Sequence, residues 1–239
     1  MIEFKQTMGV LGGMGPEATL SFYSRVIKRC QENLGSKYSE DFPHIIINST
    51  QNPDGKIWKN FDESKLKKSL FDNCILLENA GVDFIVMPCN SVHFFIDFIR
   101  SATKVKVVSI VEETAKEIKT SGVHKVLLLS TGFTSKNKVY DLKLVEYNID
   151  FIKPSDREQT EIEDIIIEVA GGNVTPSLKQ RLVAIIEKYR VTDQISGVVL
   201  GCTEIPLVLQ SGSLDIPIFD TLDILSKSAF HLITGERVN

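Results

Sequence analysis

One sequence pattern occurs twice, in Phe84–Ser91 (FIVMPCNS) and in Gly197–Glu204 (GVVLGCTE), and it determines the predicted fold. In each, a short apolar run is followed at once by a cysteine, Cys89 or Cys202, and then by small polar residues. Short runs that are almost fully apolar are typical of strands in a parallel sheet covered on both faces. Both thiols are therefore expected directly after a buried strand.

The rest of the chain alternates strand-like and helix-like segments, which predicts an α/β fold with mostly parallel sheets flanked by helices. Helical periodicity is clear, for example, in Pro16–Gln31, Glu63–Ala80, Val111–Lys119 and Leu178–Tyr189. Strands are expected at Met8–Leu11, His44–Ile47, Phe84–Met87, Val105–Val108, Val126–Leu129, Ile149–Ile152, Gly197–Leu200 and Ile216–Phe219.

An internal repeat divides these strands into two sets. Cys202 lies 113 residues after Cys89, and the opening strand Val10–Leu11 has a counterpart at Leu128–Leu129. The similar offsets predict two pseudo-symmetric lobes, residues 1–107 with 220–239 and residues 108–219. Because open α/β sheets bind ligands at the carboxyl ends of their strands, we expect the active site, with both cysteines, in the cleft between the lobes.

Composition excludes several partners. The 239-residue chain is 43% hydrophobic and 24% charged, as is typical of a globular protein. Its net charge is −4 and it has no basic cluster, so neither nucleic acid nor an anionic membrane is expected to bind. No apolar run reaches membrane-spanning length. Glycines and Pro16 interrupt the first apolar stretch, which argues against a signal peptide, and we expect a cytoplasmic protein.

None of the four cysteines belongs to a CxxC pair, so no metal site is predicted. A structural disulfide is not expected in a reducing cytosol. Cys30 and Cys74 fall in helix-like segments, where a cysteine usually serves as a small buried apolar residue.

Two thiols at one cleft suit racemisation at a carbon acid, which needs a base on one face of the carbon and an acid on the other. The helix expected after each thiol would lower its pKa from about 8.5. Of the neighbouring residues, His93 is expected to pack in the interior, and Glu204 either pairs with a helix terminus or assists Cys202. The competing interpretation is that Cys89 and Cys202 are unrelated.

Gly12–Thr19 (GGMGPEAT) links a predicted strand to a helix. Its glycines permit close backbone approach, and its free amides are able to hold a carboxylate or phosphate. It also matches the loose dinucleotide pattern G-x-G-x-x-A, but His44–Asn48 lacks the acidic residue that binds the ribose. A tight turn without a ligand is the alternative. The polar loop Ser130–Thr134 is a second candidate for holding an anionic oxygen group.

Three motifs resemble those of the aspartate/glutamate racemases: Val10–Thr19, Met87–His93 and Gly201–Pro206. The similarity runs from about Met8 to Phe230. The resemblance implies an amino-acid racemase that interconverts L and D enantiomers, with Cys89 and Cys202 as its acid–base pair. It also implies two pseudo-symmetric α/β lobes, a homodimer and catalysis without a cofactor such as pyridoxal phosphate.

The resemblance further implies which residues line the substrate site. They are Met14, Gln51, Asn90, Ser91, Thr131, Thr134 and Thr203. Aspartate is the expected substrate, but Gly55 stands where the aspartate-specific pattern has an arginine, and Ala170 where it has a lysine. A fixed guanidinium is hard to replace at a carboxylate site, so a neutral or basic amino acid is the alternative substrate.

Other classes of function stay open at this point. A related carbon-acid reaction, such as hydantoin racemisation or cis–trans isomerisation of a small diacid, would use the same two thiols. A dinucleotide-binding oxidoreductase would depend on Gly13–Ala18. An amino-acid-binding protein without catalysis is consistent with Gly55 and Ala170.

Overall fold

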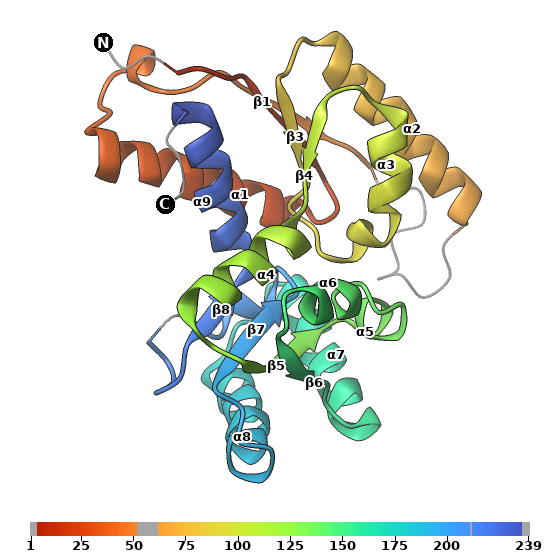
Figure 1. Cartoon of the computed structure of the whole chain (residues 1–239), viewed down its shortest axis with the longest axis vertical. Coiled ribbons are helices and arrows are strands. Elements are labelled where there is room, and N and C mark those ends of the chain that lie inside the picture. Colours follow the sequence, from red (N-terminus) through yellow and green to blue (C-terminus); the bar gives the residue numbers. More distant parts are fainter. Residues whose placement is uncertain (1–3, 52–61, 211, 236–239) are drawn as a thin grey trace. The chain divides into compact units, whose positions relative to one another are not determined.

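The computed structural model describes residues 4–51, 62–210 and 212–235, and it confirms the predicted α/β class (Figure 1). The chain divides into two compact units, Met1–Ile110 with Leu222–Asn239 and Val111–Thr221. Each unit holds one sheet of four strands, and every strand pair in both sheets is parallel.

The sheet of the first unit has the strand order β2-β1-β3-β4. Its central strand β1 is buried at all five residues, as its apolar run MGVLG predicts for a strand covered on both faces. The strands are β1 (Met8–Gly12), β2 (Ile45–Ser49), β3 (Phe84–Val86) and β4 (Lys106–Val108).

Helices cover both faces of this sheet (Figure 1). On one face α2 contacts α3. On the other, the guanidinium of Arg29 joins α1 to α9 by hydrogen bonds to Ser226 Oγ at 3.0 Å and Asp223 Oδ1 at 2.7 Å. The helices are α1 (Pro16–Arg29), continued by a π-helical turn η1 (Cys30–Leu34), η2 (Ser39–Asp41), α2 (Glu63–Asn79), the 3₁₀ turn η3 (Ser91–Phe95), α3 (Ile96–Ala102) and α9 (Thr221–Thr234).

The second sheet repeats the first, with the order β6-β5-β7-β8. Its strands are β5 (Lys125–Ser130), β6 (Asp150–Ile152), β7 (Gly197–Gly201) and β8 (Ile218–Asp220). Each number is four higher than its counterpart in the first sheet, so β5 corresponds to β1 and β7 to β3. The internal repeat of the sequence is therefore a repeat of topology. The eight predicted strands are all present, with ends shifted by at most two residues.

The core of the second unit lies between its sheet and two long helices. Leu127 and Leu129 of β5 pack in one cluster with Ile162 and Ile166 of α7 and with Leu182 of α8. The helices are α4 (Ile110–Ser121), α5 (Gly132–Lys136), α6 (Asp141–Glu146), α7 (Asp156–Ala170), α8 (Pro176–Thr192) and the 3₁₀ turn η4 (Ile205–Leu207).

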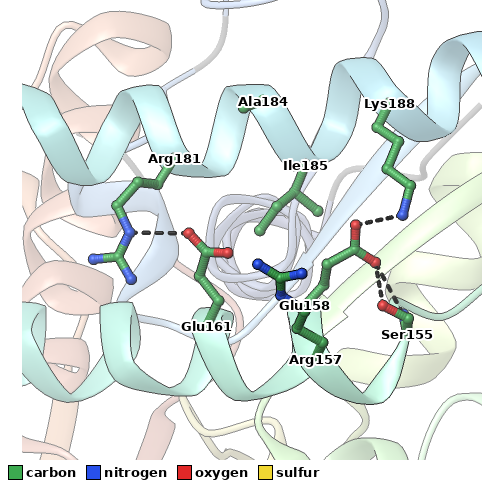
Figure 2. A pocket seen from close by; sticks show the side chains of 8 residues that line it. All are labelled: Ser155, Arg157, Glu158, Glu161, Arg181, Ala184, Ile185 and Lys188. Atoms are coloured by element: carbon green, nitrogen blue, oxygen red, sulfur yellow. Dashed lines mark hydrogen bonds and ion pairs between the residues drawn. The ribbon is translucent and has the colours of Figure 1, made fainter.

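Charged side chains hold α7 against α8 (Figure 2). Ser155 and Glu158 form a capping box at the start of α7, and the hydroxyl of Tyr189 on α8 donates to Glu158 Oε2 at 2.6 Å. Lys188 Nζ lies 2.7 Å from Glu158 Oε1. Burial alone raises the pKa of Glu158, but the hydrogen bonds from Lys188, Ser155 and Tyr189 lower it to about 2. These contacts tie the start of α7 to the end of α8.

Candidate active site

Cys89 lies just beyond the carboxyl end of β3, as predicted. Its side chain is 5% exposed, and the following Asn90 and Ser91 are also buried. The helix expected after Cys89 begins as the 3₁₀ turn η3 and continues without a break as α3.

His93 holds the Cys89 loop in place. The backbone amide of Ile110 donates to Nε2 of His93 at 3.1 Å, so Nδ1 carries the proton and donates to the carbonyl oxygen of Cys89 at 2.8 Å. A neutral, buried imidazole thus connects the carboxyl end of β3 to the residues after β4. The expectation that His93 packs in the interior is confirmed.

The glycine loop after β1 packs against the end of β2. Gly13 has a φ of +88°, and a Cβ there would lie 2.0 Å from the carbonyl oxygen of Thr50. Its amide donates to Thr19 Oγ1 at 2.9 Å. The prediction that this loop offers free amides to an anion is therefore wrong for Gly13. The close approach instead brings Met14 and Gln51 to one edge of the sheet.

The first unit thus gathers its predicted site residues at the carboxyl ends of β1, β2 and β3. They are Met14, Gln51, Cys89, Asn90 and Ser91. Gly55, where the resemblance predicts a cation, lies outside the described residues.

Cys202 lies at the equivalent place in the second unit, just beyond the carboxyl end of β7, and is 5% exposed. Its thiol donates to Oε2 of Glu204 at 2.9 Å, and the hydroxyl of Thr203 donates to the same oxygen at 3.0 Å. Of the two roles that the sequence left open for Glu204, contact with Cys202 is the one observed. The signal for it was the position of an acid two residues after the cysteine in a tight turn.

Thr131 caps α5 at the neighbouring strand end. The amide of Thr134 donates to Thr131 Oγ1 at 3.2 Å, and the two hydroxyls lie 3.1 Å apart. Both residues are buried. The carboxyl ends of β5 and β7 therefore gather Thr131, Thr134, Cys202 and Thr203 on one edge of the second sheet. Ala170 is the exposed last residue of α7.

Cys30 and Cys74 are fully buried, and their interpretation as small apolar core residues is confirmed. Burial raises the pKa of each thiol to about 11, which makes both poor nucleophiles. Among the described residues, no three His, Cys, Asp or Glu side chains come together as a metal site. No helix in the same part of the chain is long and apolar enough to cross a membrane.

Comparison with known proteins identifies relatives along nearly the whole chain. A sequence model of the Asp/Glu/hydantoin racemase family matches residues 11–229. The broad-specificity amino-acid racemase RacX of Bacillus subtilis (strain 168) is 32% identical over 225 residues, which cover 92% of this chain and 95% of RacX.

Solved structures show the same two-sheet fold. An aspartate racemase homologue from Pyrococcus horikoshii OT3 superposes with a TM-score of 0.82 at 33% identity, over 97% of this chain and all of the other. The aspartate racemase of Picrophilus torridus superposes with a TM-score of 0.82 at 25% identity, over 98% of this chain and 96% of the other.

Proposed function

The chain belongs to the Asp/Glu/hydantoin racemase family and is an amino-acid racemase, and we propose that Cys89 and Cys202 are its acid–base pair. The observation that carries this proposal is the equivalent placement of the two thiols. Each follows the strand that lies third in its sheet, β3 or β7. A repeated scaffold with one thiol in each unit suits a reaction that needs one base and one acid.

In the proposed reaction, one cysteine as thiolate takes the proton from Cα, and the other as thiol gives a proton to the opposite face of the carbanion. The first sulfur ends protonated and the second ionised, so the enzyme is then ready for the opposite enantiomer. The hydrogen bond from Cys202 to Glu204 supports Cys202 as the protonated partner at rest, because a carboxylate disfavours a second negative charge beside it. Cys89 is then the thiolate.

Polar groups beside the two thiols bind the α-carboxylate in this mechanism. Their amides and hydroxyls stabilise the enolate-like charge that develops as Cα loses its proton. The donors are Asn90, Ser91, Thr131 and Thr203, and Met14, Gln51 and Thr134 complete the substrate contacts. All seven lie at the carboxyl ends of strands in their own units, which supports the assignment.

The proposed substrate range is broad and includes aspartate. RacX, named for broad specificity, and the aspartate racemase of Picrophilus torridus both support this range. We propose further that the enzyme works in the cytoplasm, as a homodimer and without pyridoxal phosphate. Absorbance of the purified protein tests the last point, because bound pyridoxal phosphate absorbs where the protein itself does not.

The proposal is tested by incubating the protein in heavy water with single L-amino acids: aspartate, glutamate, methionine, alanine, lysine and arginine. A racemase gives both deuterium at Cα, seen by NMR, and the D enantiomer, seen by chiral chromatography. Binding without Cα exchange for every amino acid contradicts the proposal and indicates a binding protein. Turnover of a hydantoin or a cis-diacid alone indicates one of the related carbon-acid reactions.

A further inference from the structure

The carboxylate of Glu163 on α7 lies close to the start of α5. A Cβ built on Gly132 would lie 2.7 Å from Oε2 of Glu163, which is the nearest described atom outside the chain neighbours of Gly132 and the backbone of its own helix. Gly132 directly follows Thr131, the cap of α5 and a proposed substrate contact. Glu163 therefore places its charge at the edge of the second sheet where Thr131 and Thr134 lie.

The carboxylate of Glu163 has no hydrogen-bond or ion-pair partner among residues 4–51, 62–210 and 212–235. Two cations of the second unit are engaged by other acids. Lys153 Nζ lies 2.7 Å from Asp141 Oδ1, and Arg181 Nε lies 3.0 Å from Glu161 Oε1 (Figure 2). Neither neutralises Glu163.

A second acceptor lies one helical turn before Glu163. Gln159 donates through Nε2 to the carbonyl oxygen of Ser130 at 2.9 Å, which holds its amide at the carboxyl end of β5. Its Oε1 is buried and has no hydrogen-bond partner among the described residues. Residues four apart lie on the same face of a helix, so α7 presents two acceptors without a donor to this edge.

The same face of α7 carries no cation further along. Ala170 lies seven residues after Glu163, which is about two helical turns, so it is on the same face and carries no charge. On the part of α7 that faces this edge, the charge is therefore the negative charge of Glu163. A substrate carboxylate is repelled there, whereas an ammonium or guanidinium finds acceptors.

We propose that Glu163 determines specificity by binding the cationic side chain of the substrate, so that lysine and arginine are preferred to aspartate. This inference rests on the proposed racemase function and narrows its substrate class. Gln159 supports the same group through Oε1. A charge-assisted hydrogen bond changes binding by about 10- to 100-fold, which is enough to rank substrates within a broad range.

The test compares the wild-type enzyme with Glu163→Gln, which keeps the shape of the side chain and removes its charge. Values of kcat/KM are measured for lysine, for methionine as a neutral substrate of similar length, and for aspartate. Asp164→Asn is the matched control, because Asp164 is an exposed acid on the same helix that points about 100° away from Glu163.

The wild type is expected to favour lysine over aspartate. Glu163→Gln is expected to lower kcat/KM for lysine by about 10- to 100-fold, mainly through KM, and to change that for methionine by less than about threefold. Asp164→Asn is expected to leave all three values unchanged. A wild-type preference for aspartate, or an equal loss for lysine and methionine in Glu163→Gln, overturns the inference.

Calorimetric titration with lysine and with aspartate separates this inference from the proposed function. If no amino acid is racemised but lysine still binds in a manner that depends on Glu163, the racemase proposal fails and the role of Glu163 stands. If racemisation proceeds and lysine binding is the same in Glu163→Gln, the role of Glu163 fails alone. Thermal unfolding of each variant shows whether it is folded.

Discussion

Sγ of Cys202 lies 2.9 Å from Oε2 of Glu204, with the thiol as the donor. This contact predicts that Glu204 governs how easily Cys202 gives up its proton. In Glu204→Gln the neighbouring negative charge is gone and the thiolate forms more readily. The alkaline limb of kcat/KM should therefore move to lower pH, by about one unit, and kcat/KM should fall by about tenfold or more.

Glu204→Asp is the control for this prediction, since it restores the charge on a shorter side chain. It should return the alkaline limb toward its wild-type position even if kcat/KM recovers only in part. A pH profile that is identical in Glu204→Gln and the wild type would show that the contact has no role in proton transfer.

His93→Ala should destabilise the protein markedly. The substitution removes the hydrogen bonds that His93 makes to the buried carbonyl of Cys89 and to the amide of Ile110, at an expected cost of about 3 kcal/mol in the free energy of unfolding. Urea unfolding measures this cost. His44→Ala removes an exposed imidazole and should cost less than about 0.5 kcal/mol. Equal costs for the two variants would mean that the bridge made by His93 contributes nothing.

Gly13→Ala and Gly35→Ala form a second matched pair. Both glycines have positive φ, +88° and +69°, but a Cβ meets backbone only at Gly13, while Gly35 has open space. Gly35→Ala should cost about 1 kcal/mol from its backbone conformation alone. Gly13→Ala should cost about 1–3 kcal/mol more, and it should reduce activity by displacing Met14 and Gln51. Unfolding midpoints measure the loss of stability, and kcat/KM measures the loss of activity. Similar losses of stability in the two variants would contradict the close approach of Gly13 to Thr50.

Glu158→Gln should remove part of the acid sensitivity of the protein. Because the folded-state pKa of Glu158 is about 2, below an unfolded value of about 4.3, its contribution to stability is complete above pH 4.3 and is lost as the pH falls toward 2. The stability gap between wild type and Glu158→Gln should therefore narrow over that range. It is measured by urea unfolding at several pH values.

Glu187→Gln is the control for the pH experiment. Glu187 pairs with Arg190 on the exposed face of α8, where an ion pair contributes little, so the gap for this variant should be small at every pH. A gap for Glu158→Gln that stays constant from neutral pH to pH 2 would contradict the role of the contacts from Lys188, Ser155 and Tyr189.

Much of the fold was predictable because it depends on local pattern. The short apolar runs such as Phe84–Val86 were recognisable as buried strands, and the repeated cysteine turns placed both thiols after strands. The internal repeat of the sequence also indicated that the two sheets have the same strand order, because similar sequences form similar units. Strand ends moved by a residue or two because hydrogen bonding to neighbours, and not pattern, determines where a strand stops.

The remaining features depend on contacts between distant residues. Nothing local to His93 shows that it accepts from Ile110, and the glycine pattern does not reveal that Thr19 uses the amide of Gly13. The role of Glu163 is not visible in the sequence for a similar reason. It lies beside the apolar residues of α7, so the sequence alone predicts a solvent-exposed acid. Only the structure shows that its carboxylate lies against Gly132. The periodicity of apolar residues predicts that α7 is a helix, but it does not predict which strand end the helix packs against.

The most direct test of the two-thiol mechanism is racemisation by Cys89→Ala and Cys202→Ala, each compared with the wild type and with Cys30→Ala, a substitution of a buried cysteine that the mechanism does not use. Formation of the D enantiomer from an accepted L-amino acid is followed in heavy water. We predict that either single substitution lowers the rate by about 10²- to 10⁴-fold, while Cys30→Ala remains close to wild type. Undiminished racemisation in Cys89→Ala or in Cys202→Ala would contradict the pairing of these two cysteines.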